Sequence, residues 1–179
     1  MANLQLDHAQ HRPARPALAL RYLVHDFEVP MNVGSVFRIA DALGVEMVHL
    51  TGGSAVPPNR KLRRTSRGTE QHVPFRHDAD PLPVLHQLRA AGYRIVSLEL
   101  ASASIDIREL PVAATDRLCL VLGSENRGVS QALLDASDRT VHIPMLGAHS
   151  SMNVATACAI ATFEIIRAFP SAPARGAVR

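Results

Sequence analysis

Hydrophobic residues along the chain occur in short continuous runs that alternate with stretches of helical periodicity. The runs have the length of strands and lack the polar–apolar alternation of a half-buried strand, so they predict strands that are buried on both faces. We expect these strands at 21–27, 45–50, 73–75, 93–100, 117–123 and 140–145. Strands that alternate with helices predict a mostly parallel sheet with helices on both faces, which is an α/β fold.

Helices are expected between these strands wherever apolar residues recur at i, i+3, i+4 and i+7. The first is expected from Pro30 to Leu43, with Gly44 ending it. Others are predicted at 80–92, at 129–137 with Ser130 as its cap, and at 151–169. The last of these is apolar on nearly every face, which indicates a helix that is deeply buried or shared with a partner subunit.

The composition is that of an ordinary globular domain, with 179 residues, 47% of them hydrophobic and 20% charged. We expect a flexible arm at 1–18, one domain at 19–169 and a flexible tail at 170–179. No run approaches the roughly 18 apolar residues of a membrane span, and the first residues lack the apolar stretch of a signal peptide. A cytoplasmic protein is therefore expected. Cys119 and Cys158 lie in apolar runs without metal or redox spacing, which favours buried free thiols.

Positive charge is concentrated in one segment, although the net charge is only +3. Residues 59–67 read NRKLRRTSR, with five cations and no acid. Such a patch favours a polyanion such as RNA, although a solvated loop tuned for solubility explains the charge equally well. With Arg127 added from a later loop, the candidate phosphate-binding residues are Arg60, Lys61, Arg63, Arg64, Arg67 and Arg127.

The loops after three of the apolar strands are rich in Gly, Asn, Ser and Pro, within segments 29–44, 120–130 and 141–164. In an open α/β sheet, ligands bind outside the carboxyl ends of the strands, so these loops are candidates for a site. The chain has no G-x-G-x-x-G after a strand, no phosphate-binding G-x-x-x-x-G-K-[ST] and no G-x-S-x-G. Dinucleotide, nucleoside-triphosphate and α/β-hydrolase sites are disfavoured on this basis. The nine histidines follow no metal-binding pattern, so no metal is expected.

The three segments resemble, in the same order, the three motifs of the SPOUT class of RNA methyltransferases, in particular its SpoU/TrmH-like branch. The resemblance extends over residues 20–169 and rests on Asn32-x-Gly34 with Arg38, on Gly123-x-Glu125-x-x-Gly128, and on Ile143–Pro144–Met145 followed by Ser151–Met152–Asn153–Val154. It implies methyl transfer from S-adenosylmethionine to a ribose 2′-hydroxyl of structured RNA. It also implies a deep trefoil knot in the C-terminal third and a homodimer in which the last helix packs across the two-fold axis.

The resemblance further implies roles for single residues. The cofactor positions are Leu98, Gly123, Ile143, Ser151 and Met152, although core packing alone explains Leu98 and Ile143. Arg38 is expected to hold the phosphate beside the target ribose and to stabilise the developing alkoxide, because a guanidinium is not deprotonated near neutral pH. The alternative is a surface Arg38 paired with Asp41.

Positioning roles are implied for Asn32, Glu125 and Asn153. Asn32 is also a candidate N-cap for its helix, Glu125 a candidate partner of Arg38 or of the ribose, and Ser151 a candidate cap for the last helix. For Asn32 and Asn153, purely structural roles are open as well.

The resemblance also bears on the kind of RNA. The extra N-terminal RNA-binding domain of many ribosomal-RNA members is not found in this chain, which favours tRNA over rRNA. Three alternatives stay open: a SPOUT enzyme that methylates a base nitrogen, a non-catalytic RNA-binding module, and a generic α/β nucleotide-binding enzyme. The Asn32/Arg38 motif argues against the first, and the presence of Arg38, Glu125 and Asn153 argues against the second.

Overall fold

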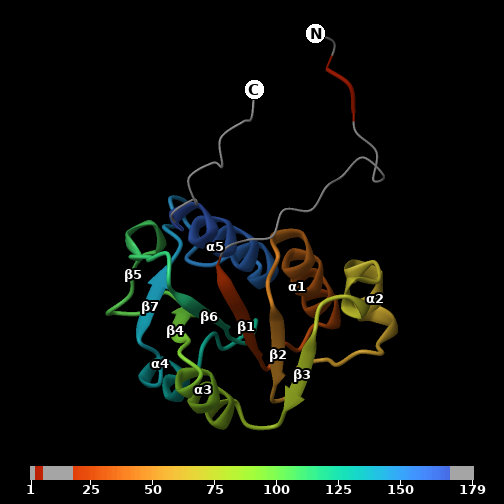
Figure 1. Ribbon diagram of the computed structural model, residues 1–179, viewed down its shortest axis with the longest axis horizontal. Coiled ribbons are helices and arrows are strands. Elements are labelled where there is room, and N and C mark those ends of the chain that lie inside the picture. The colour runs from red at the N-terminus through yellow and green to blue at the C-terminus, as the bar shows by residue number, and fades with distance from the viewer. Residues whose placement is uncertain (1–2, 6–17, 170–179) are drawn as a thin grey trace.

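A seven-stranded sheet with helices on both faces forms the centre of the molecule (Figure 1). The computed structural model describes residues 3–5 and 18–169. The strands lie in the order β3-β2-β1-β6-β4-β7-β5, and every neighbouring pair is parallel. Their bounds are β1 Ala19–His25, β2 Met47–Thr51, β3 Phe75–Asp78, β4 Arg94–Leu98, β5 Ile105–Asp106, β6 Arg117–Leu122 and β7 Arg139–His142. The predicted α/β class is confirmed.

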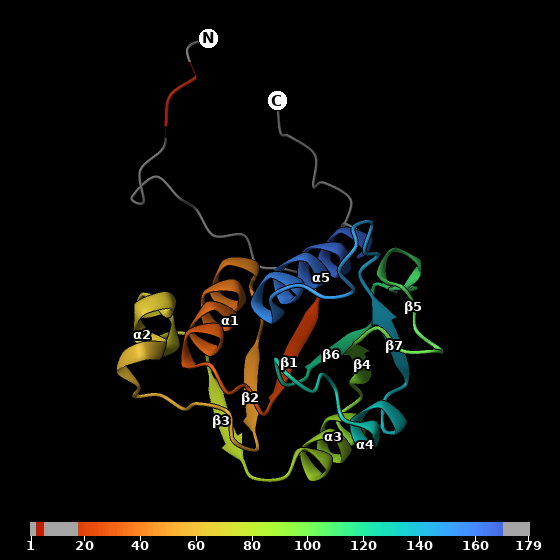
Figure 2. The ribbon, with the colours of Figure 1, turned by 180° about the vertical axis from the view of Figure 1, so that it is seen from behind.

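The helices form two layers. The pair α1 and α5 covers one face of the sheet, α3 and α4 cover the other, and α2 packs on the outer side of α1 (Figures 1 and 2). Their bounds are α1 Pro30–Leu43, α2 Arg60–Ser66, α3 Pro81–Ala90, α4 Gln131–Asp135 and α5 Val154–Ala168, with short 3₁₀ turns at Thr69–Gln71 and Ile107–Glu109. No helix of the described ranges 3–5 and 18–169 is long and apolar enough to cross a membrane.

Each central strand contributes to two separate cores, because successive side chains of a strand point to opposite faces. In β1, Tyr22 and Val24 pack toward α1 and α5, and Leu23 packs toward α3 and α4. This double burial explains why the strands read as unbroken apolar runs. Cys119 and Cys158 are fully buried free thiols, as predicted, and burial raises the pKa of each to about 12.

Some predicted boundaries are wrong. The basic segment 59–67, for which no helix was predicted, folds into α2, since the Asn59 side chain caps it and Leu62 is buried against α1. The strand expected at 73–75 begins only at Phe75, and the strand β5 was not expected. Ser130 occupies the N-cap position of α4 but makes no side-chain capping bond. The predicted arm and tail lie mostly outside the described residues, so those boundaries stay predictions.

Candidate functional site

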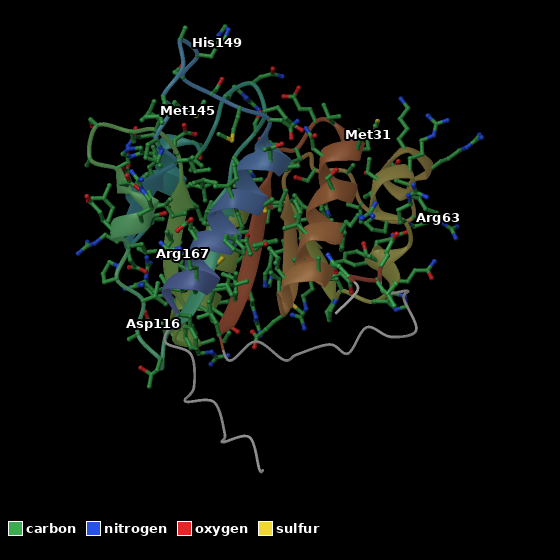
Figure 3. The ribbon with its side chains drawn as sticks, turned by 90° about the horizontal axis from the view of Figure 1, so that it is seen from above. Met31, Arg63, Asp116, Met145, His149 and Arg167 are labelled. Atoms are coloured by element: carbon green, nitrogen blue, oxygen red, sulfur yellow. The ribbon has the colours of Figure 1, made fainter. Side chains whose placement is uncertain are left out.

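A cavity of about 450 Å³ lies at the carboxyl ends of β4, β6 and β7. Its walls come from the segments that follow these three strands and from the start of α5. All five predicted cofactor positions line it: Leu98, Gly123, Ile143, Ser151 and Met152. Figure 3 shows that Met145, in the loop after β7, lies at the same edge of the sheet as Met31 at the start of α1, with Asp116 at the opposite edge. The structure therefore brings the three predicted motif segments to one edge of the sheet.

Backbone packing closes one wall of this cavity. A Cβ atom on Gly123 would lie 2.1 Å from the carbonyl carbon of Gly128 and 2.2 Å from the nitrogen of Val129. The loop after β6 folds back in this way because Gly128 adopts a φ of 65° and its N–H donates to the Ser124 carbonyl at 2.8 Å. No residue with a side chain fits at position 123 without moving this loop.

Glu99, which no motif pointed to, joins the loop after β4 to the loop after β6. Its carboxylate accepts hydrogen bonds from the backbone N–H of Val129 at 2.8 Å and of Leu100 at 3.0 Å. A Cβ on Gly128 would meet the same carboxylate at 2.2 Å. Glu99 lines the cavity and directly follows β4, but the predicted strand 93–100 placed it inside the strand, so only the correct strand end would have pointed to it.

His142 also lines the cavity and was not predicted. Its Nδ1 atom lies 2.9 Å from the Ser104 hydroxyl, which in turn bonds the backbone of Ala101. His142 is the last residue of β7, but the predicted strand 140–145 placed it inside the strand, so only the correct strand end would have identified it.

The three predicted positioning residues form one hydrogen-bonded chain. Asn153 Nδ2 donates to Asn32 Oδ1 at 3.1 Å, and Asn32 Nδ2 donates to Glu125 Oε1 at 2.8 Å. The carboxylate can only accept, so Asn32 must present its NH₂ group to Glu125 and its oxygen to Asn153. Each of the three motifs thus contributes one member, and the Glu125 and Asn153 ends line the cavity.

The two end members of this hydrogen-bonded chain, Glu125 and Asn153, each also hold the start of a helix. Glu125 accepts from the backbone N–H of Glu28 at 2.9 Å and of Val29 at 3.2 Å, at the N-terminus of α1, where a negative charge is favourable. Asn153 Oδ1 accepts from the N–H groups of Ala155 and Thr156 and so caps α5. The positions of α1 and α5 relative to the cavity are therefore set by these side chains.

Two predicted caps are wrong. Asn32 is not the N-cap of α1: that position is Val29, and Pro30 begins the helix, so Asn32 lies inside its first turn. Ser151 does not cap the last helix, because α5 starts only at Val154 and Asn153 is its cap. Glu125 supplies the acceptor oxygen at the start of α1, and Asn153 supplies it at the start of α5. Local sequence rules had assigned these roles to Asn32 and Ser151.

Arg38 lies on an exposed surface of α1, outside the cavity lining. It is six residues after Asn32, which corresponds to about 9 Å along the helix. Within the described chain its guanidinium makes no hydrogen bond or ion pair, so neither Asp41 nor Glu125 is its partner. The side chain is free for a ligand from solution.

The predicted basic residues separate into two groups. Arg127 lines the cavity and forms an exposed ion pair with Asp26 at 3.3 Å. The other five lie on or next to α2, on the far side of α1, where Figure 3 labels Arg63. All five are exposed, and none is ion-paired to another described residue: Arg60, Lys61, Arg63, Arg64 and Arg67.

Residues 19–163 match the family described as SpoU rRNA Methylase. The chain is 30% identical over 158 residues to a putative TrmH family tRNA/rRNA methyltransferase of Staphylococcus haemolyticus, covering 88% of this chain and 62% of that protein. The chain thus spans less than two thirds of this relative.

Solved structures with the same fold agree with this match. The SpoU methyltransferase AviRb from Streptomyces viridochromogenes, in complex with the cofactor AdoMet, superposes with a TM-score of 0.76 at 30% identity, covering 90% of this chain and 64% of that one. A structure described as giving insights into the 2-OH methylation of C/U34 on tRNA has a TM-score of 0.75 at 28% identity, covering 86% of this chain and 97% of that one. The chain belongs to the SpoU rRNA methylase family, as its three motifs predict.

Proposed function

We propose that this protein transfers a methyl group from S-adenosylmethionine to a ribose 2′-hydroxyl of structured RNA. The observation that carries the proposal is the cavity lined by all five predicted cofactor positions, with the chain of Asn32, Glu125 and Asn153 at its edge. The AdoMet complex of the related AviRb protein supports the choice of cofactor.

The residues of the cavity fit this cofactor. A volume of about 450 Å³ falls in the range of pockets for small molecules, roughly 300–1,000 Å³. Leu98, Ile143 and Met152 offer apolar walls for an adenine ring, and the segments at Gly123 and Ser151 bring backbone and hydroxyl groups to the polar part of the ligand. When bound, S-adenosylmethionine supplies an electrophilic methyl group.

The residues of the chain contribute to the reaction by stabilising the charge that develops and by positioning the groups that react. The ribose hydroxyl loses its proton to solvent as its oxygen attacks the methyl carbon, so negative charge develops on that oxygen until the O–C bond has formed and the bond from the methyl group to sulfur has broken. We assign to Arg38 the stabilisation of this charge, together with a two-point grip on the adjacent phosphate. Asn32, Glu125 and Asn153 hold the first turn of α1 and thereby set where Arg38 lies relative to the cavity.

Transfer of labelled methyl groups to bulk RNA, followed by digestion to nucleosides, tests the proposal. We expect 2′-O-methylated nucleosides with the wild type and none with Arg38→Ala, while calorimetry shows equal cofactor binding by both proteins. A methylated base would identify an enzyme of the base-nitrogen type. Cofactor or RNA binding without any transfer would identify a non-catalytic module.

We propose tRNA as the substrate. The support is the neighbour concerned with C/U34 on tRNA, which is matched over 97% of its length. Ribosomal RNA is the alternative, favoured by the description of the family. Phosphate contacts are proposed for Arg127 and for the basic residues of α2. Comparing methyl transfer to purified tRNA and to ribosomal RNA from a strain lacking the protein decides between the two.

A knotted C-terminal third and a homodimer in the cytoplasm complete the proposal. Support for the knot is the loop after β6, which is folded against Glu99 beside the start of α5. Support for the dimer comes from α5, where Ile160 and Phe163 are 37% and 58% exposed and share one face. In sedimentation, we expect a wild-type dimer and a folded Phe163→Lys monomer. A monomeric wild type at micromolar concentration would contradict the dimer.

A further inference from the structure

A second groove, of about 520 Å³, lies at the sheet edge formed by β3, between α2 and the loop before it. It shares no lining residue with the cavity at β4, β6 and β7. Its lining includes two prolines and a phenylalanine together with two arginines: Pro57, Pro58, Phe75, Arg60 and Arg63. None of the motifs accounts for this groove.

The groove has a charged part and an apolar part, and the side chains of both can contact a ligand. The guanidinium groups of Arg60 and Arg63 are exposed, and no carboxylate of the described residues pairs with them. Glu70, the acid in the lining, accepts a hydrogen bond from the Ser66 hydroxyl. The Phe75 ring is held edge-on against Phe37, with 5.6 Å between centroids. The groove thus combines free positive charge with a fixed apolar floor.

We propose that this groove binds one unpaired nucleotide of the RNA, with the phosphate on Arg60 and Arg63 and the base against Pro57, Pro58 and Phe75. Guanidinium groups match phosphate oxygens in a two-point geometry, and splayed-out bases pack on aromatic and apolar side chains. The volume falls within the range of small-ligand pockets, roughly 300–1,000 Å³. The inference rests on the proposed function, since it names a second contact for the same RNA.

The position of the groove relative to the cavity is set by α1. Thr65 Oγ1 in α2 donates to the Met31 carbonyl in the first turn of α1 at 2.7 Å. Gly34 lets the two helices approach closely, because a Cβ there would lie 2.2 Å from the Leu62 carbonyl oxygen. Axes of packed helices are typically about 8–10 Å apart. The groove and the cavity therefore keep a fixed relative position across α1, so that one RNA can contact both.

Two double variants of α2 test the proposal. Arg60→Ala with Arg63→Ala removes the two groove cations, and Lys61→Ala with Arg64→Ala removes two cations of the same helix that do not line the groove. The measurements are filter binding of a uridine octamer and of an abasic octamer of equal charge, and the KM and kcat for RNA. We expect the groove variant to raise the KM for RNA by roughly tenfold more than the control variant, with kcat unchanged.

The pair of octamers isolates the contact with the base. Wild type and the control variant should bind the uridine octamer more tightly than the abasic one, and the groove variant should lose this preference. If the two double variants had equal effects, or if the wild type did not prefer the uridine octamer, the proposed nucleotide site would be refuted. The proposed methyl transfer would not be affected by that result. A wild type that binds the octamer as expected but methylates no RNA would instead overturn the proposed function.

Discussion

Replacing Gly123 by alanine probes the closest backbone contact of the cavity. The new Cβ would lie 2.1 Å from the Gly128 carbonyl carbon, and 2.2 Å from both the Gly128 oxygen and the Val129 nitrogen. These are backbone atoms, so the loop after β6 must move. An extra methyl group in a well-packed site typically costs about 1–3 kcal/mol. In a domain of this size each kcal/mol lowers Tm by roughly 2–4 °C, so a drop of several degrees is expected.

Gly147→Ala is the matched control, because an added Cβ there meets nothing within 4 Å. Thermal unfolding and calorimetry with S-adenosylmethionine should show wild-type behaviour for this control. For Gly123→Ala we expect both the lower Tm and a large loss of cofactor affinity, since the displaced loop is a wall of the cavity. A Gly123→Ala protein with wild-type Tm and affinity would refute the close packing and its link to the ligand.

Three further substitutions test the assigned roles. Arg38→Lys should leave Tm nearly unchanged because Arg38 is exposed and unpaired within the described chain, yet lose most methyl transfer; near-full activity would contradict a two-point contact. Glu125→Gln should lower the free energy of unfolding in urea by about 1–2 kcal/mol, because one donor at the start of α1 then faces an NH₂ group; an unchanged midpoint would contradict this. Burial, aided by the charge of Arg21, lowers the pKa of His49 to about 4, below its unfolded value of 6.5; protonation therefore favours unfolding, and stability falls as the pH drops from 6.5 toward 4. In His49→Leu the difference in Tm between pH 7 and pH 4.5 should shrink, and an unchanged difference would exclude His49 as its source.

The strands were predictable because burial on both faces leaves a pattern that is local in sequence. Tyr22 and Leu23 are neighbours that pack into different cores, so their run contains no polar interruption. The helix α2 left no such pattern. Leu62 is its one buried apolar residue, and the helix depends on the Asn59 cap and on packing against α1. The packing of α2 against α1 involves residues distant in the sequence, so the sequence of α2 alone does not reveal it.

The cavity was predictable for a topological reason, and its hydrogen bonds were not. Loops after parallel strands meet at one edge of the sheet, so a site there was expected, and the resemblance supplied the individual positions Gly123 and Ile143. The acceptor for the backbone N–H groups of Glu28 and Val29 at the start of α1 is instead Glu125, which lies 93 residues beyond Asn32 in the chain. Local capping rules consider only neighbouring residues and therefore chose Asn32.

The two buried thiols give the protein internal reporters of local opening. Cys119 lies in the central strand β6 and Cys158 in α5, and both are fully enclosed. Alkylating reagents must reach the sulfur and attack it as the thiolate. Because burial prevents both, each cysteine becomes reactive only when its own element separates from the rest. The rates at which the two sites are labelled would thus distinguish loosening of α5 alone from unfolding of the whole sheet, without introducing any foreign probe.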